Sequence, residues 1–326
     1  MYLYPDYMQK YLTPVQGIFL RKLLLADADE VRNLIFSVLE EYNLHPEPGA
    51  TDADLYEVTR FYPDGRFWVM VDESDNIKGS AALYKMDSNT AELRKMYFHP
   101  SLRNQGLGRW LMSFVLHEAV KAGYKTVCLE TATVLREARK LYTGFGFVEQ
   151  PGDCHSARCD LKMSLDIATQ NTEVIKHFPE VRWTDSGDED FRELVCRLDQ
   201  ELAVRDGDEH AFYHQYNKID QIKNALVLLV DGRPVACGAF KPYDDTTAEV
   251  KRMYVLPEHR QKGYAARVLS LLELWAARLG YGRCILETGK RQPEAIALYR
   301  KNNYQLMKNF GQYEGIDNSV CFEKIL

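Results

Sequence analysis

An internal repeat is the feature that most restricts how this chain folds. Residues 91–97 (AELRKMY) match residues 248–254 (AEVKRMY), and the same offset of 157 residues carries Leu141-Tyr142 onto Leu298-Tyr299. Small, charged and aromatic residues match in one unbroken register, so the chain is a duplication. The period is far longer than that of a solenoid unit, and 326 residues exceed what one hydrophobic core usually supports. Each copy is therefore predicted to be a whole domain.

The expected domains are residues 17–166 and 174–326, joined by a polar linker at 167–173 (IATQNTE). Each copy is predicted to have the same order of elements. A strand leads to helices with acidic caps, two β-rich runs, the repeat strand, a Gly-rich turn, a long helix, a further short strand, a helix ending at the paired tyrosines and closing strands. This order predicts an α/β (α+β) fold. The expected strands are 17–22, 67–71, 79–84, 91–98 and 126–131 in the first copy, and 181–183, 225–230, 235–240, 248–255 and 283–288 in the second.

Net charge and cysteine content limit the expected binding partners and the expected cellular compartment. The formal net charge of -6 argues against a nucleic-acid partner, because phosphate binding needs clustered cations that acids do not balance. The seven cysteines include no CxxC pair, which fits free thiols in a reducing compartment. The opening segment lacks the features of a signal peptide, and no apolar run is long enough to span a bilayer. A cytoplasmic protein without a membrane partner is the expectation, as a monomer or homodimer.

A Gly-rich turn follows the repeat strand in both copies, at 103–108 (RNQGLG) and 260–265 (RQKGYA). Glycine lets successive N–H groups point at one spot, and the following helix adds its positive N-terminal end. The turn is therefore predicted to bind a pyrophosphate, with Arg103 and Lys262 as added charge. An ordinary turn is the alternative, which the repetition disfavours. A Rossmann site is set aside, because its turn follows the first strand of a βαβ unit rather than the fourth strand.

These turns and strands resemble the GNAT superfamily of acetyl-CoA-dependent N-acetyltransferases, whose pyrophosphate loop reads [RQ]-x-x-G-x-[GA]. The resemblance implies a twisted mixed sheet in which the fourth and fifth strands splay apart and hold the pantetheine arm of acetyl-CoA. It implies that the backbone of the fourth strand contacts the cofactor. The cofactor-binding residues so implied are Met96, Tyr97, Phe98, Arg103, Asn104, Gln105, Gly106, Leu107 and Gly108 in the first copy, and Met253, Tyr254, Val255, Arg260, Gln261, Lys262, Gly263, Tyr264, Ala265 and Gln292 in the second.

Acetyl transfer to an amine requires a base, a stabilised oxyanion and protonation of the leaving thiolate. Glu92 and Glu249 match a family position for a catalytic glutamate, and the alternative is an edge-strand carboxylate paired with a neighbouring cation. Glu130 and Glu287 are the second candidates. By the same resemblance, the backbone N–H of Met96 or Met253 would bind the oxyanion.

Tyr142 and Tyr299 match the family tyrosine that donates a proton to the thiolate, and a half-buried core tyrosine is the alternative. Where many family members carry a cofactor-contacting Asn, this chain has Leu135 and Gln292. The hydrogen bond to the cofactor is therefore expected in the second copy and not in the first.

Two polar clusters have other interpretations. Cys154, His155, Cys159 and Asp160 lie in a segment where alternation along a closing strand explains them without a metal, so no metal is expected. His155 and Arg158 would bind a substrate carboxylate if they face the acceptor notch. The other cluster, His210 and His214, is interpreted as an exposed helix face.

The function predicted is transfer of an acetyl group from acetyl-CoA to a primary amine of a small molecule, an amino acid or related metabolite, by direct attack in a ternary complex. Three alternatives stay open: a protein or peptide N-acetyltransferase, a non-catalytic acyl-CoA-binding module, and one active copy fused to a structural one.

Overall fold

The computed structural model describes residues 10–168, 178–207, 219 and 222–326. These residues form two compact units, Lys10–Phe178 and Pro179–Leu326, which are described separately. The predicted domain limits, 17–166 and 174–326, stay predictions. Residues 169–173 of the predicted linker and the pair His210 and His214 lie outside the described residues. None of the described helices has the length and apolar character needed to cross a membrane.

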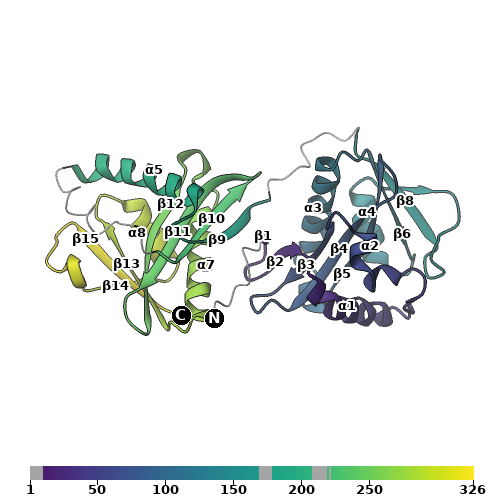
Figure 1. The fold of residues 1–326 in the computed structure, drawn as a ribbon, viewed down its shortest axis with the longest axis horizontal. Helices are drawn as coiled ribbons and strands as arrows, with labels where there is room; N and C mark the ends of the chain where they lie inside the picture. The colour runs from purple at the N-terminus through teal and green to yellow at the C-terminus, as the bar shows by residue number, and fades with distance from the viewer. Residues whose placement is uncertain (1–9, 169–177, 208–218, 220–221) are drawn as a thin grey trace. The chain divides into compact units, whose positions relative to one another are not determined.

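The strands of the first unit follow the order β1-β2-β3-β4-β5-β6-β8-β7 (Figure 1). All neighbours are antiparallel except β5 and β6, which are parallel. The single parallel pair requires a crossover, which the long helix α3 provides. The strands are β1 (Lys10–Leu12), β2 (Phe19–Lys22), β3 (Phe67–Val71), β4 (Ile77–Lys85), β5 (Thr90–Phe98), β6 (Thr126–Thr131), β7 (Val148–Gln150) and β8 (Leu161–Asp166).

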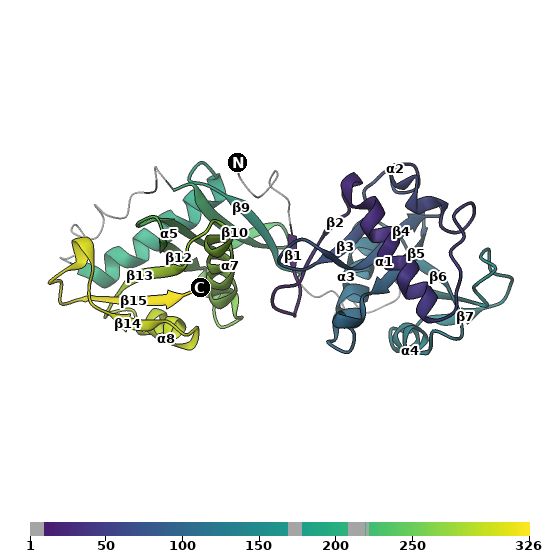
Figure 2. The same ribbon diagram turned by 90° about the horizontal axis from the view of Figure 1, so that it is seen from below.

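Helices cover both faces of this sheet (Figure 2). α3 (Leu107–Lys121) packs Leu111, Phe114 and Val115 on the face formed by Leu20, Trp68 and Leu83. α1 (Ala28–Glu41) contacts β4 and β5 with an apolar stripe of Val31, Leu34, Ile35, Val38 and Leu39. That spacing of three and four residues is what makes one side of a helix apolar. The remaining helices are α2 (Val58–Phe61) and α4 (Arg136–Gly144).

The second unit repeats this plan in the order β14-β15-β13-β12-β11-β10-β9, and only β12 and β13 are parallel. α5 packs Phe191 on the face of Cys237 and Ala239, whereas α7 meets the intervening Gly238 from the other face. The strands are β9 (Glu180–Thr184), β10 (Asn224–Val230), β11 (Arg233–Pro242), β12 (Thr247–Val255), β13 (Arg283–Gly289), β14 (Gln305–Met307) and β15 (Ser319–Ile325), and the helices are α5 (Glu189–Asp206), α7 (Tyr264–Arg278) and α8 (Pro293–Lys301).

The parallel pairing stops part-way along the strands, which opens a notch in each unit. β5 and β6 are paired from Thr90 to Leu93 on the β5 side, and the rest of β5 leaves β6. β12 and β13 are paired only from Thr247 to Glu249. The predicted splaying of the fourth and fifth strands is therefore confirmed in both copies.

The predicted strands are observed, with three differences. The first strand begins at Phe19 rather than at 17, because Gly17 has a φ of +77°, which extended backbone does not allow. The helices that carry the tyrosines continue to Gly144 and Lys301. The segment 154–160 is a loop rather than part of a closing strand, because its backbone N–H groups bind a side chain on β6 instead of a strand partner.

Candidate active site

A β-bulge shapes the notch of each unit. Ser80 faces Tyr97 and Ala82 faces Arg94, so two residues of β5, Lys95 and Met96, lie opposite one residue of β4. Lys95 has a φ of +53°, and its counterpart Arg252 on β12 has a φ of +58°. A bulge turns the strand and leaves a residue out of the hydrogen-bond ladder. Met96 and Met253 are bulge residues, which is the local geometry that an oxyanion-binding N–H would need, and that role stays a prediction.

The bulge carbonyls are satisfied by side chains of the neighbouring strand. Ser80 Oγ donates to the Lys95 carbonyl at 2.7 Å, and Cys237 Sγ lies 3.4 Å from the Arg252 carbonyl. Gly238 follows Cys237, and a Cβ there would lie 2.7 Å from Met253 Sδ. The second bulge therefore requires glycine at position 238 for packing.

The Gly-rich turns have the backbone that an anion site needs. Asn104 and Gly106 have φ values of +61° and +77°, and Gln261 and Gly263 repeat this with +62° and +81°. Gly106 and Gly263 are the residues preceding α3 and α7, and a Cβ on either would meet no atom within 4 Å. The first N–H groups of a helix have no partner within the helix, so the open start of α3 and of α7 suits a phosphate.

The groove beside the first notch has a volume of about 390 Å³. α1 and α4 line its sides, and the free part of β5 lines its floor. Of the predicted cofactor residues, it is lined by Met96, Tyr97, Phe98, Arg103, Asn104 and Gly108. Gln105, Gly106 and Leu107 do not line it, and Leu107 is buried in the core. Leu135 lines it where many family members have Asn.

The matching groove of the second unit has a volume of about 650 Å³. Gln292 lines it at the residue preceding α8. Of the other predicted residues, it is lined by Met253, Tyr254, Val255, Arg260, Gln261, Gly263, Tyr264 and Ala265, and Lys262 is absent from the lining.

The first arginine of each Gly-rich turn binds protein groups. Arg103 donates to the Phe98 carbonyl at 3.0 Å and to both carboxylate oxygens of Glu41, at 2.6 and 3.1 Å. Arg260 donates to the Val255 carbonyl at 3.0 Å and to Glu201 at 2.5 Å. Each arginine thus joins the end of the notch strand to the preceding helix. Direct phosphate binding by these two side chains stays a prediction.

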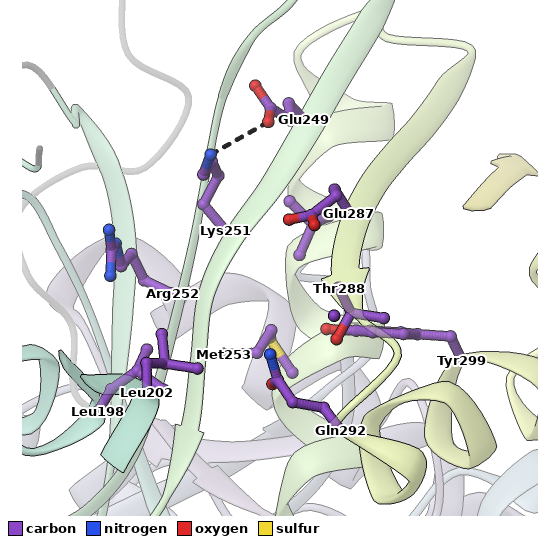
Figure 3. Close-up of a pocket in the computed structure, with 12 residues that line it drawn as sticks. Leu198, Leu202, Glu249, Lys251, Arg252, Met253, Glu287, Thr288, Gln292 and Tyr299 are labelled. Atoms are coloured by element: carbon purple, nitrogen blue, oxygen red, sulfur yellow. Dashed lines mark hydrogen bonds and ion pairs between the residues drawn. The ribbon is translucent and has the colours of Figure 1, made fainter. Parts of the chain in front are cut away.

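The two tyrosines lie at the notches. Tyr142 lines the first groove, and Tyr299 lines both the groove and the smaller pocket of the second unit. Figure 3 shows the Tyr299 hydroxyl pointing from α8 into that pocket, towards Met253 on β12. Burial raises the pKa of both phenols well above 10, and the charge of Glu287 adds to the effect at Tyr299. Both therefore stay protonated at neutral pH, the state that a proton donor requires.

Glu92 and Glu249 are buried in the notch strands and paired with cations. Glu92 Oε2 accepts from Arg94 at 2.8 and 2.5 Å. Glu249 lies 3.2 Å from Lys251 and 3.1 Å from Lys241. The edge-strand interpretation is wrong in one respect, because Glu92 sits where β5 is paired with both β4 and β6.

Glu130 and Glu287 stand on the splayed strands β6 and β13. Glu130 accepts backbone N–H groups of His155 and Ser156 and lies 2.7 Å from His155 Nδ1. Burial favours the neutral acid, but the hydrogen bonds from His155 outweigh it and hold the pKa of Glu130 below its usual value. Glu287 accepts from Ser319 Oγ at 2.7 Å.

A second cavity lies on the other side of the first notch, with a volume of about 390 Å³. Tyr97 lines both this cavity and the cofactor groove, so the two meet at this residue. Burial raises the pKa of Tyr97 to about 12, against the opposing charge of Arg158. The cavity is lined by Ala50, Thr51, Asp54, Phe61, Glu92, Arg94, Lys95, Tyr97, Glu130, His155, Ser156, Arg158 and Cys159.

The equivalent pocket of the second unit is smaller, about 90 Å³ in the part of the chain that the structure describes. Leu198 and Leu202 of α5 occupy its side, as Figure 3 shows. Glu249 and Glu287 both face it, and Lys251 points to Glu249.

The sequence analysis missed a buried network in the first unit. Lys95 donates to Asp52 at 2.6 Å and lies 3.0 Å from Asp54. Arg158 donates both terminal nitrogens to Asp52, at 2.6 and 2.8 Å. Binding of a substrate carboxylate by Arg158 stays a prediction, and these bonds oppose it. The bulge cation pairs instead with Asp199 of α5 in the second unit. No local pattern marks Asp52, because its two cation partners, Lys95 and Arg158, are more than 40 residues away in the sequence.

The family assignment rests on both copies. The model of the acetyltransferase (GNAT) family matches residues 33–147 and 186–304, which is more than half of the chain. The chain belongs to this family and is an acetyl-CoA-dependent N-acetyltransferase. The two matched regions, with the notch and Gly-rich turn in each, make it a tandem member.

The chain is similar to several individual proteins. The chain is 36% identical over 138 residues to the uncharacterized N-acetyltransferase YjgM of Escherichia coli, covering 40% of this chain and 83% of that protein. It is 34% identical over 101 residues to the N-acetylaspartate synthetase of Danio rerio, covering 30% of this chain and 36% of that protein. A crystal structure of a GNAT acetyltransferase from Staphylococcus aureus covers 46% of this chain and 99% of that one, with 21% identity and a TM-score of 0.42.

Proposed function

We propose that the chain acetylates a primary amine of a small molecule, and that the acceptor binds in the cavity of the first unit. The observation that carries the proposal is the position of this cavity, which shares the lining residues Arg94, Lys95 and Tyr97 with the cofactor groove. Its volume of about 390 Å³ falls in the range of small-molecule sites. A relative named for the synthesis of N-acetylaspartate supports an amino acid or related metabolite as acceptor.

The residues around the notch suit direct attack in a ternary complex. Acetyl-CoA in the groove along β5 brings its thioester to the bulge, where the backbone N–H of Met96 binds the oxyanion. The amine attacks from the second cavity, the C–S bond breaks, and Tyr142 donates its proton to the departing thiolate. The same roles are proposed for Met253 and Tyr299 in the second unit. Glu249 is proposed as the base of the second unit, after release from its paired cation. In the first unit Glu92 is the candidate that the family position indicates, and it too would first have to leave its cation, Arg94.

Calorimetry with acetyl-CoA tests the first step of the proposal. We expect two sites per chain, one in each groove, and no binding would contradict the proposal. A panel of primary amines, including amino acids, amino sugars and polyamines, then tests the acceptor, with N-acetyl products followed by mass spectrometry. Turnover of peptides with no turnover of any small amine would replace the proposal by the peptide alternative.

A further inference from the structure

We propose that His155, oriented by Glu130, is the base that removes the proton of the acceptor ammonium in the first unit. This inference rests on the proposed function and names a further catalytic residue for it. His155 lies in the loop between β7 and β8, and it is one of the residues that line the proposed acceptor cavity, with Glu130 and Tyr97.

The hydrogen bond to Glu130 defines which nitrogen acts as the base. His155 Nδ1 lies 2.7 Å from Glu130 Oε1. An ionised carboxylate only accepts hydrogen bonds, so Nδ1 must carry a proton, and in the neutral imidazole the lone pair is then on Nε2. Among the described residues, no hydrogen bond or ion pair involves Nε2. A base whose ring is held by a third group in this way is the arrangement that activated catalytic sites share.

Glu130 is itself a poor base, because its carboxylate is already saturated with donors. The backbone N–H of His155 donates to both oxygens, at 3.0 and 2.9 Å, and the N–H of Ser156 adds a third contact at 3.3 Å. Lys162 lies 3.5 Å away from Oε1. These interactions stabilise the ionised form of Glu130. Its contribution is therefore to position the loop and the imidazole.

Glu92 is less suited than His155 because it is committed to Arg94. Two nitrogens of Arg94 donate to Glu92 Oε2, and the residue is 9% exposed. The side chain of His155 is 80% exposed, so it can pass a proton to solvent after each turnover. Other ionisable groups near the Glu130–His155 pair are Lys162 of β8, Cys128 of β6, and Cys154 and Cys159 of the same loop.

The proton balance is complete without a further reactant. Nε2 takes one proton from the ammonium and releases it to water. The neutral amine attacks the thioester carbon, and the C–S bond breaks. The thiolate takes the proton of Tyr142, and the second amine proton restores the phenol. One acetyl group moves and one proton is released per turnover.

The second unit lacks the pairing of this glutamate with a histidine. Glu287, the counterpart of Glu130, accepts from Ser319 Oγ, and the segment Gly311–Tyr313 before β15 contains no histidine. The two copies are therefore expected to differ in their pH profiles.

The test uses the full chain with Gly263→Asp, which removes the cofactor from the second unit, and compares His155→Gln with Asp160→Asn. Asp160 lies in the same loop as His155 and accepts hydrogen bonds from the backbone N–H and the Oγ1 of Thr133, both at 2.7 Å. The Asp160→Asn variant therefore perturbs the loop and keeps the imidazole. We expect His155→Gln to lower kcat/KM by about 100-fold and to remove the acidic limb of its pH profile. Acetyl-CoA affinity should not change. The Asp160→Asn variant should keep the limb.

Chemical rescue separates a base from a structural role. In His155→Ala, added imidazole should restore turnover in proportion to its free-base concentration, and an equal concentration of the non-basic analogue pyrazole should not. Retention of the acidic limb in His155→Gln, or no rescue by imidazole, would overturn the inference and leave the proposed function intact. No amine turnover by the unsubstituted chain would instead overturn the proposed function and this inference together.

Discussion

Lys95 donates a hydrogen bond of 2.6 Å to Asp52, and both side chains are at most 3% exposed. This bond joins the β-bulge of the notch to the loop that follows α1, across 43 positions of sequence. Arg158 binds the same carboxylate from a third segment. The wall of the acceptor cavity in the first unit is therefore held by one buried acid.

Replacing Asp52 by Asn should destabilise the first unit by about 3 kcal/mol, because it leaves two buried cations without their anion. Urea unfolding, followed by hydrogen exchange of the β5 amides, measures the change. Asp199→Asn is the matched control, since Asp199 pairs with the bulge cation of the second unit but is 27% exposed. An equal loss in both variants would show that burial of the pair is not the cause.

The same carboxylate makes stability depend on pH. Burial opposes ionisation, but Arg158 and Lys95 outweigh it and hold the pKa of Asp52 well below its usual 3.8. Above that value the acid is ionised in the folded and the unfolded chain, and its stabilisation is complete. As the pH falls below 3.8, the unfolded chain takes up the proton first, so the free energy of unfolding should decline. Asp52→Asn should remove this part of the acid dependence, as denaturation between pH 5 and 2 would reveal.

Substitutions at Gly106 and at Gly263 test the two proposed cofactor sites one at a time. Asp and Asn both tolerate positive φ better than other residues, so Gly106→Asp and Gly106→Asn impose similar backbone strain. Only Asp adds a negative charge where the pyrophosphate is proposed to bind. We expect Gly106→Asp to reduce the calorimetric stoichiometry from two to one, and Gly263→Asp to do the same. The Asn variants should retain two sites. If the Asn variants also lost a binding site, backbone strain rather than the added charge would be the cause.

Tyr142→Phe and Tyr299→Phe test the proton donors. Each removes one hydroxyl and keeps a ring that is mostly buried. We expect kcat of the affected unit to fall by about 100-fold, with acetyl-CoA affinity nearly unchanged. The other unit is silenced by its Gly→Asp substitution. Single-turnover rates then report the chemical step of the remaining unit apart from its acetyl-CoA affinity. A collapse of affinity without a slower chemical step would identify the tyrosine as a packing residue.

An ion pair joins two elements that line the second groove, and among the described residues of the first unit no such pair joins α1 to α4. Arg205 of α5 pairs with Glu294 of α8, and Arg291 donates to the Arg205 carbonyl at 3.2 Å. Exposed pairs contribute up to about 1 kcal/mol. We therefore expect Glu294→Gln to speed CoA dissociation from the second unit by up to about 5-fold, and less so at high salt. Glu137→Gln, at the matching place in the first groove, is the control for stopped-flow measurement.

Much of the architecture was predictable because it repeats locally. Alternating and apolar runs predicted β3 without error and the notch strands within one residue. The Gly-rich turns were predictable as turns of special backbone geometry, since only glycine adopts the positive φ of Gly106 without cost. Phosphate binding there stays a prediction. Errors arose where a distant contact decided the backbone. The loop at 154–160 resembled a strand in sequence, and the carboxylate of Glu130 takes its N–H groups instead.

The sequence by itself determined the duplication and the order of elements along each copy, because these depend on short-range pattern and backbone preference. The residues of each notch followed from the family resemblance. The tertiary structure decided which side chains meet there. It paired Glu92 with Arg94, Asp52 with Lys95 and Glu130 with His155, and it gave the two units pockets of different size beside the notch. Such contacts depend on where distant loops cross the sheet, and burial then makes each charge select its partner.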